Sequence, residues 1–269
     1  MDVKLLPDTQ KIIEKFIQTR VKEAGATGAV IGLSGGVDSA TTLALAVSAL
    51  GSENITGLIM PFNRTESVDL ASGHAQMLGV KTRELNISPL VELFKGSTDS
   101  FSSKASEGNL HSRVRMTFLY GEAFRSGSLV MGTSNKSELL VGYYTKWGDG
   151  ASDLLPVGDL YKSQVYHLAR ELGIPTGILE RKPTAELWEG QTDEDELGID
   201  YVTLDQILLG LERQLSLKRI SSKTAITLES VERIDNLIKS SIHKRVFPPV
   251  CKIGRRTVGL DWRETIGSQ

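Results

Sequence analysis

Apolar positions along the chain recur with two periods, which predict helices and buried strands in alternation. Residues 8–24 carry apolar side chains three and four positions apart, the spacing of one face of a helix. Residues 29–33 form a short, unbroken apolar run, as expected of a strand that is buried on both faces. Strands that alternate with helices in this order are typical of a parallel sheet covered by helices on both sides.

The alternation continues to about residue 172. Extended segments are predicted at residues 55–60, 82–87, 129–132 and 154–157. Helices are predicted at about 40–47, 66–78, 90–94, 110–125 and 162–172, and another begins near Ser134 or Asn135. The serine-rich stretch 97–107 is interpreted as a surface loop. We therefore expect the α/β fold class, with a doubly wound, mostly parallel five-stranded sheet of the Rossmann-like kind and helices on both faces.

Composition excludes several classes of protein. The formal net charge of −2, from 31 Lys and Arg against 33 Asp and Glu, argues against strong nonspecific binding to nucleic acid or to an anionic membrane. A single cysteine, Cys251, permits neither an internal disulfide nor a cysteine-rich metal cluster, which fits a reducing compartment. The sequence has no signal-peptide core and no run of roughly 18 apolar residues that could span a bilayer. We expect a soluble, cytoplasmic protein without nucleic-acid or membrane partners.

The most distinctive motif is the loop at residues 34–39, Ser-Gly-Gly-Val-Asp-Ser, between the first predicted strand and the helix after it. A glycine turn ahead of a helix directs backbone N–H groups at one point, and without Cβ atoms an anion can come close to the backbone. The loop therefore predicts a phosphate or pyrophosphate site. It lacks the Gly-Lys-Ser/Thr ending of the commoner phosphate-binding loop, so transfer of a terminal phosphoryl group is not the expected chemistry. Asp38 can instead bind a divalent cation that bridges phosphate oxygens, and the hydroxyls of Ser34 and Ser39 can donate to those oxygens.

A second polar stretch, residues 132–157, follows a predicted strand. Ligands of such sheets bind beyond the carboxyl ends of the strands, where the strand order reverses, so the residues after Leu33, Met60 and Gly132 should be neighbours. Glu138 has two interpretations. It is a favourable charge in the first turn of a helix, or, paired with Asp38, it is a second carboxylate for Mg²⁺.

Together with the loop, later motifs in fixed order resemble ammonia-dependent NAD synthetase, a family of the ATP pyrophosphatases. The loop by itself is shared with GMP synthetase, asparagine synthetase and tRNA-modifying relatives, whereas residues 143–156 are more specific to NAD synthetase. The resemblance covers about residues 10–245. It implies a single NAD synthetase domain at 1–269, in which these residues are the core and about 246–269 are a C-terminal tail. The motifs that carry it are Gly132-Thr133, Glu138, Tyr144-Thr145-Lys146, Gly148-Asp149-Gly150, Asp153-Leu154-Leu155-Pro156, Lys162, Arg113-Val114-Arg115-Met116, Lys182-Pro183-Thr184-Ala185-Glu186-Leu187, Asp193-Glu194-Asp195-Glu196-Leu197-Gly198 and His243-Lys244.

The resemblance implies the two-step amidation of nicotinic acid adenine dinucleotide, here called deamido-NAD. Its pyridine carboxylate attacks the α-phosphorus of ATP, which gives an acyl-adenylate and releases pyrophosphate, and ammonia then displaces AMP. Adenylation is needed because the oxide of a free carboxylate is a poor leaving group. Catalysis can come from positioning and from groups placed where phosphate charge builds up.

The family's roles carry over by position. Asp38 and Glu138 would hold Mg²⁺, and the catalytic residues would be Asp38, Asp149 and Lys162, with Lys162 neutralising phosphate charge. Asp149 is expected to attract ammonium and to accept its proton, since the glycines beside it allow close approach of the backbone. Deamido-NAD would contact Arg113, Lys146, Asp153, His243 and Lys244. Some of these contacts would cross the interface of a two-fold homodimer. ATP would contact Gly32, Leu33, Ser34, Gly35, Gly36, Val37, Asp38, Ser39, Thr133, Lys162 and Thr184.

Most of these residues have a structural alternative. Lys162 at a helix start is equally compatible with a solvated charge, and Arg113 with a surface ion pair. His243-Lys244 is compatible with cations that favour a helix C-terminus. The aromatic residues within 143–147 can pack in a core or stack on a ligand ring. Residues 181–198 can be a solvated loop or a lid that excludes water from the acyl-adenylate.

Two departures from the common bacterial pattern affect the site. Ser134-Asn135 stands where Asp-His is frequent, and the region after Pro61 is short, which leaves Asn63 and Arg64 as candidates for adenine contact. The chain has no room for the amidase domain and nucleophilic cysteine that glutamine hydrolysis needs, so free ammonia is the expected donor. A GMP-synthetase-like amidotransferase and an ATP-binding module without catalysis are the alternatives.

Overall fold

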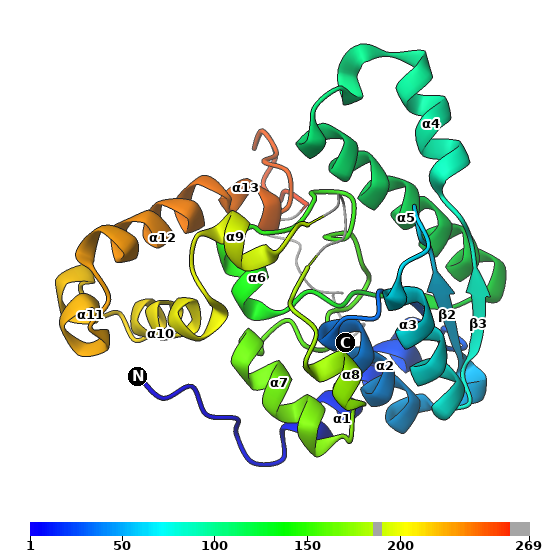
Figure 1. The fold of residues 1–269 in the computed structure, drawn as a ribbon, viewed down its shortest axis with the longest axis horizontal. Helices are drawn as coiled ribbons and strands as arrows, with labels where there is room; N and C mark the ends of the chain where they lie inside the picture. The colour runs from blue at the N-terminus through cyan, green and yellow to red at the C-terminus, as the bar shows by residue number, and fades with distance from the viewer. Residues whose placement is uncertain (185–189, 259–269) are drawn as a thin grey trace.

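The centre of the fold is a parallel sheet (Figure 1). The computed structural model describes residues 1–184 and 190–258. The strands are β1 (Ala29–Gly32), β2 (Ile55–Ile59), β3 (Lys81–Glu84) and β4 (Leu129–Met131), and their order in the sheet is β3-β2-β1-β4. Ile31 of β1 lies opposite Gly57 on one side and Met131 on the other. The strand order therefore reverses between β1 and β4, which is where ligands of such sheets bind.

The described part of the sheet has four strands, not the five expected. The segment predicted at 154–157 makes one parallel bridge, between Leu154 and Met131, and the N–H of Gly132 donates to the carbonyl of Leu154 at 2.9 Å. Pro156 follows two residues later, and because proline has no N–H it cannot extend the ladder. The extended segment is therefore present but ends before it becomes a strand.

Helices cover both faces of the sheet, as predicted. On one face lie α1 (Thr9–Glu23), α2 (Val37–Leu50), α3 (Glu66–Met77), α7 (Lys162–Glu171) and α8 (Thr176–Leu179), and on the other α4 (Ser88–Ser97) and α5 (Lys104–Ser126). Alternate side chains of β1 supply the two cores, since Ala29 and Ile31 pack with the first set and Val30 with the second. The doubly wound α/β class is thus confirmed.

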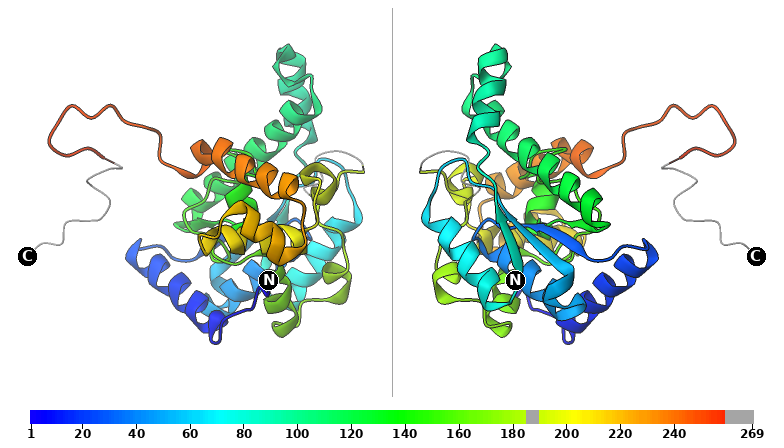
Figure 2. Two further views of the ribbon diagram at one scale, coloured as in Figure 1. Left: turned by 90° about the vertical axis from the view of Figure 1, so that its left-hand side faces the viewer. Right: turned by 90° about the vertical axis from the view of Figure 1, so that its right-hand side faces the viewer.

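The serine-rich stretch 97–107 is not a loop, so that prediction was wrong. Helix α4 runs to Ser97, a short 3₁₀ turn spans Asp99–Phe101, and α5 begins at Lys104. Ser103 and Ser106 cap α5 reciprocally, because each side-chain oxygen accepts from the other residue's N–H at 3.2 Å. The serines therefore mark a helix start. Helix α4 and the beginning of α5 project beyond the body as an arm (Figure 2).

A cluster of short helices lies beside the sheet, on the left in Figure 1. It consists of α6 (Lys136–Val141), α9 (Asp193–Leu197), α10 (Tyr201–Glu212), α11 (Leu217–Thr224), α12 (Leu228–Ser240) and α13 (Ile242–Arg245). They bury a separate core that includes Leu204, Ile207 and Val231. Beyond residue 172, the sequence predicted only one helix end, near His243, so this cluster is a finding of the structure.

The described tail, residues 246–258, runs away from the helical cluster (Figure 2). Within residues 1–184 and 190–258, no helix combines the length and the apolar character needed to cross a membrane.

Candidate active site

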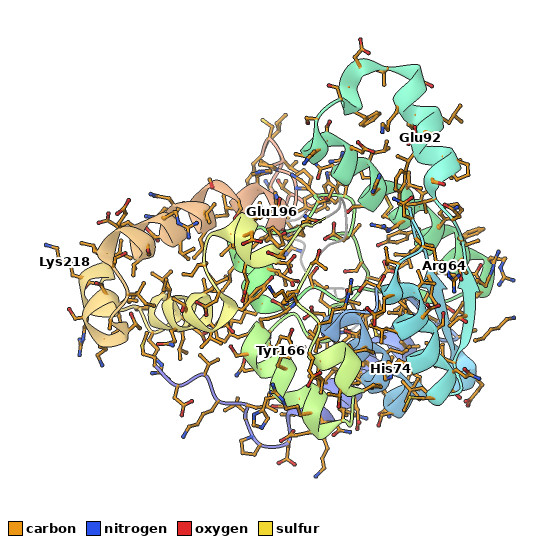
Figure 3. All side chains as sticks on the ribbon, in the orientation of Figure 1. Arg64, His74, Glu92, Tyr166, Glu196 and Lys218 are labelled. Atoms are coloured by element: carbon orange, nitrogen blue, oxygen red, sulfur yellow. The ribbon has the colours of Figure 1, made fainter. Side chains whose placement is uncertain are left out.

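A cavity of about 1100 Å³ opens at the carboxyl ends of the strands, between the sheet and the helical cluster. Residues that follow β1, β2 and β4 line it, together with α5, residues 142–151 and the described parts of 181–196. Tyr166 of α7 and Glu196 of α9, both labelled in Figure 3, border it as well. Pockets for one small ligand usually measure about 300 to 1000 Å³, so this cavity is slightly larger than the upper end of that range.

The loop after β1 forms one wall of the cavity. Gly35 has φ +74°, and a Cβ atom there would lie 2.3 Å from the carbonyl oxygen of Ser67, so only glycine fits. The Ser39 hydroxyl donates to the Gly36 carbonyl at 3.0 Å and lies 3.1 Å from the Ser34 hydroxyl. Gly36 is the N-cap of α2 and has no side chain to cover the first N–H groups of that helix. All loop residues predicted to bind ATP line the cavity except Gly35, which packs behind it.

Asp38, Glu138 and Lys162 meet at the base of the cavity. The Lys162 ammonium lies 2.5 Å from Asp38 Oδ2 and 3.3 Å from Glu138 Oε1. These residues come from the first turns of α2, α6 and α7, which all start at the same edge of the sheet. The Lys162 side chain is only 3% exposed, so it is not a solvated charge at a helix start. The structure therefore brings together the two predicted metal ligands and the predicted phosphate-neutralising lysine.

The cluster is short of positive charge. Asp193 of α9 adds a third carboxylate, and burial raises its pKa although Lys162, Tyr201 and Tyr143 all lower it. Burial likewise raises the pKa of Glu138 to about 8; the nearby Lys162 lowers this pKa, and the nearby Asp38 and Asp193 raise it further. Burial by itself would lower the pKa of Lys162, but attraction to Asp38 and Glu138 outweighs it and raises that pKa. Three carboxyl groups thus share one buried cation.

This deficit fits a divalent cation. Mg²⁺ is usually held by one or two carboxylates together with substrate phosphates, and Asp38 and Glu138 can supply those carboxylates. Among the described residues, no group of three or more His, Cys, Asp or Glu forms a metal cage by itself. Phosphate oxygens would therefore have to complete the coordination of Mg²⁺ here.

Asp149 borders the cavity from the opposite wall. The N–H of Thr145 donates to Asp149 Oδ1 at 3.0 Å, and Ser112 donates a further hydrogen bond. Burial nevertheless raises the pKa of Asp149. A Cβ at Gly148 would lie 2.7 Å from Ser112 Cβ, and one at Gly150 would lie 2.3 Å from the Tyr144 ring. The glycines on either side thus allow the close packing that holds this carboxyl group in place.

The five residues predicted for deamido-NAD do not gather in the cavity. Only Lys244 lines it, where its ammonium donates to the carbonyls of Gly142 at 2.6 Å and Tyr144 at 2.8 Å. Arg113, Lys146 and His243 form a chain outside the cavity, because Arg113 donates to the Lys146 carbonyl and Lys146 Nζ to the His243 carbonyl at 2.7 Å.

Asp153, the fifth predicted substrate residue, is hydrogen-bonded to β4, the strand at one edge of the sheet. One of its carboxylate oxygens accepts from the N–H of Val130 at 2.7 Å, and the other from the Tyr120 hydroxyl at 3.4 Å. Burial and the nearby Asp153 raise the pKa of Tyr120 to about 12, so its hydroxyl stays protonated. Both hydrogen bonds of Asp153 therefore join it to the protein's own fold, to β4 and to α5.

The remaining candidates divide in the same way. Thr133, Thr184 and Asn63 line the cavity. Arg64, labelled in Figure 3, lies outside it and pairs with Asp69 at 2.7 Å and Glu84 at 3.1 Å. Of the aromatic residues, Tyr143 and Tyr144 line the cavity, whereas Trp147 is 55% exposed. The motif residues Ala185, Glu186 and Leu187 lie outside the described residues.

Sequence reasoning did not assign Asn135 or Asp193 a role. Asn135 is fully buried and its amide donates to Asp38 Oδ1 at 3.0 Å. Its side-chain oxygen accepts from the N–H of Glu138 at 3.0 Å, while Glu138 accepts from the N–H of Asn135 at 3.2 Å. The three-residue spacing of this capping box was visible in the sequence. Nothing in the acidic run 193–196 distinguished Asp193, the one residue of the run that is buried.

A comparison with protein families identifies the chain. The model of the family described as NAD synthase matches residues 9–248, which include every loop and side chain of the site above. The chain belongs to the NAD synthase family. Within that family, it is 46% identical over 240 residues to the NH(3)-dependent NAD(+) synthetase of Pyrococcus furiosus, which covers 89% of this chain and 93% of the relative.

Two solved structures resemble the fold closely. The NMN synthetase of Francisella tularensis superposes with a TM-score of 0.83 at 35% identity and covers 93% of this chain and 100% of that chain. The NH3-dependent NAD synthetase of Campylobacter jejuni superposes with a TM-score of 0.78 at 29% identity and covers 94% of this chain and 100% of that chain. Both likenesses therefore cover more than nine-tenths of this chain.

Proposed function

We propose that this chain is a ligase that makes NAD from deamido-NAD, ATP and free ammonia. The carboxylate of deamido-NAD attacks the α-phosphorus of ATP, pyrophosphate leaves, and ammonia displaces AMP from the acyl-adenylate. One observation carries the proposal: a glycine loop without lysine shares a cavity with the cluster of Asp38, Glu138 and Lys162. Membership of the NAD synthase family supports it.

The ATP end of the reaction fits the loop and the ionic cluster. Backbone N–H groups at the start of α2 and the hydroxyls of Ser34 and Ser39 would bind phosphate oxygens. Lys162 stays charged at neutral pH, because its pKa is raised, and stabilises the charge that builds up on the α-phosphate during attack. Asp38 and Glu138 would hold Mg²⁺, which, when bound, adds positive charge to the phosphate oxygens.

The ammonia end of the reaction fits Asp149. Ammonium must lose a proton before its lone pair can attack the acyl carbon, and the Asp149 carboxylate would accept that proton. Burial raises the pKa of this carboxyl group, so it binds a proton more readily than an ordinary aspartate. Nitrogen then bonds to the carbonyl carbon as the bond to the AMP oxygen breaks.

The position of three predicted deamido-NAD residues outside the cavity fits a homodimer. Arg113, Lys146 and His243 lie at its outer edge, where a partner subunit could complete a site for the part of deamido-NAD that the cavity does not enclose. We also propose that the reaction takes place in the cytoplasm, in line with the single cysteine of the chain.

The mononucleotide form of the substrate is a second candidate. The likeness to the NMN synthetase of Francisella tularensis, at 35% identity, is the observation that favours it. The same adenylation chemistry would then act on the deamido mononucleotide and yield NMN.

Product analysis tests both candidates. The protein is incubated with ATP, Mg²⁺ and either deamido-NAD or its mononucleotide, with ammonium or glutamine as donor, and NAD, NMN, AMP and pyrophosphate are measured. We expect equal amounts of NAD, AMP and pyrophosphate, with ammonium as the effective donor. A higher kcat/KM for the mononucleotide would replace the first candidate by the second. ADP and orthophosphate as products, turnover of xanthosine monophosphate instead, or ATP binding without products would overturn the proposal.

A further inference from the structure

Asp205 is a buried carboxylate that the mechanism above does not use. It lies in the middle of α10 and is fully buried. Three donors surround it: the Ser137 hydroxyl at 2.5 Å, the Ser163 N–H at 2.8 Å and the Ser163 hydroxyl at 2.5 Å. Burying a carboxylate costs free energy unless hydrogen-bond donors satisfy it, so these three donors are what allows Asp205 to be buried here.

The donors of Asp205 are the immediate neighbours of the site residues. Ser137 precedes Glu138 at the start of α6, and Ser163 follows Lys162 at the start of α7. The Ser137 hydroxyl also accepts from the N–H of Lys162 at 3.0 Å, so the two helix starts are joined directly. Asp205 therefore fixes two backbones whose next side chains form the cluster with Asp38.

We propose that Asp205 is a positioning residue for the adenylation site. It holds α6 and α7 together so that Glu138 and Lys162 stand at the correct spacing around Asp38, and Mg·ATP binds to that preset arrangement. The inference rests on the proposed function, because it assigns Mg·ATP to this cluster. Residues that orient the groups in contact with a metal or substrate commonly change affinity or activity 10- to 100-fold when they are replaced.

Kinetics of Asp205→Asn separate positioning from simple stabilisation. We expect about a tenfold rise in KM for ATP and in the Mg²⁺ concentration for half-maximal rate, with an unchanged KM for ammonium. Calorimetric titration with Mg·ATP, without the acyl substrate, should show the same loss of affinity. The matched control is Ile207→Val in the same helix, which removes one buried methyl group from the helical core. It should lower Tm slightly and leave every kinetic constant unchanged.

A double-mutant cycle tests the path through Ser137. If Asp205 acts by holding Ser137, then Ser137→Ala and Asp205→Asn should raise KM for ATP by less together than the product of their separate effects. Should Asp205→Asn not fold, Ser137→Ala and Ser163→Ala are measured singly and should shift the Mg²⁺ midpoint in the same direction. A fall in Tm with wild-type KM values and Mg·ATP affinity, or fully independent effects, would overturn the inference. If the wild-type enzyme forms no NAD, the proposed function would be refuted instead.

Discussion

At the scale of single residues, surroundings decide what a side chain can do. Lys162 looks like a surface lysine in the sequence, yet it is buried between Asp38 and Glu138 and remains charged there. Asp149 and Asp153 are four positions apart, but the first faces the cavity and the second accepts a hydrogen bond from the N–H of Val130 in β4. Role follows from contact and burial, and residue type only limits the choice.

Asp149→Asn should block the second half-reaction and spare the first. Asparagine keeps the size and the hydrogen bond from Thr145 but cannot accept a proton, so NAD formation should fall about 100-fold or more. Pyrophosphate release on mixing with ATP and deamido-NAD should persist. Rapid-quench measurement of pyrophosphate and NAD distinguishes the two steps. Asp159→Asn, at a side chain that is 96% exposed, is the control and should behave as wild type. Normal NAD formation at every ammonium concentration would show that Asp149 is not the base.

At the scale of elements, the site depends on short helices that cannot be stable alone. Helix α6 has only six residues, fewer than an isolated helix needs in water, so its cap and its tertiary contacts hold it. Asn135 supplies the cap and at the same time donates to Asp38. One buried residue thereby sets both the start of α6 and the orientation of a predicted metal ligand.

Asn135→Ala should lower stability and activity together. Loss of the cap should cost about 1 kcal/mol of unfolding free energy, and kcat/KM for ATP should fall because Asp38 and Glu138 both lose a partner. Urea unfolding and steady-state kinetics measure the two effects. The control is Thr227→Ala, which removes the exposed N-cap of α12, where the N–H of Ser230 donates to Thr227 at 3.2 Å. It should cost a similar free energy and leave kinetics unchanged, and equal kinetics for both variants would refute a role for Asn135 in the site.

At the scale of the whole molecule, the cavity lies where two separately packed cores meet. Among the described residues, the sheet core and the helical core have no residue in common. Glu138 and Lys244 reach the cavity from the helical cluster, whereas Lys162 reaches it from α7, which packs on the sheet. Next to the cavity wall, His111 of α5 stacks on Phe62 with ring centroids 4.4 Å apart. Within the described residues neither ring nitrogen of His111 has a hydrogen-bond partner. A protonated ring there would be poorly accommodated.

Acid should therefore destabilise the fold through His111. Burial, with the charge of Arg115, lowers the pKa of His111 from 6.5 to about 4, while Glu107 opposes this and Lys95 adds slightly to it. The unfolded chain takes up the proton below about pH 6.5, so this contribution to stability is complete above that pH and is lost as the pH falls toward 4. Between pH 7.5 and 5 the loss amounts to about 2 kcal/mol.

Urea unfolding of His111→Phe at both pH values tests this effect. Phenylalanine keeps the stack on Phe62 but cannot be protonated, so the variant should lose about 2 kcal/mol less than wild type between pH 7.5 and 5. His167→Gln, at a histidine side chain that is 61% exposed, is the control. It should lose as much unfolding free energy as the wild type between the two pH values. If wild type and His111→Phe lose the same unfolding free energy between pH 7.5 and 5, His111 does not bind its proton as inferred.

The sequence by itself determined the order of elements around the sheet and the chemistry of the loop at 34–39. Helical and strand periods are local, so α1, β1, β2 and β4 could be located within a few residues. The turn at Gly35 and the place of Asp38 in the first turn of α2 could be predicted from the glycine pair between an apolar run and a helical pattern, and anion binding there stays a prediction. Serine, by contrast, favours both loops and helix caps, which is why 97–107 was misread.

Only the tertiary structure decided which polar residues meet. Asp38 and Lys162 are 124 positions apart, and Asp205 reaches Ser137 and Ser163 from a third helix, so no local period records these contacts. Burial is likewise a property of the assembled cores, and it alone distinguishes Asp193 from its acidic neighbours and Lys162 from a solvated lysine. The sequence limits which groups are present, and packing sets the distances and the shielding from water on which their charges depend.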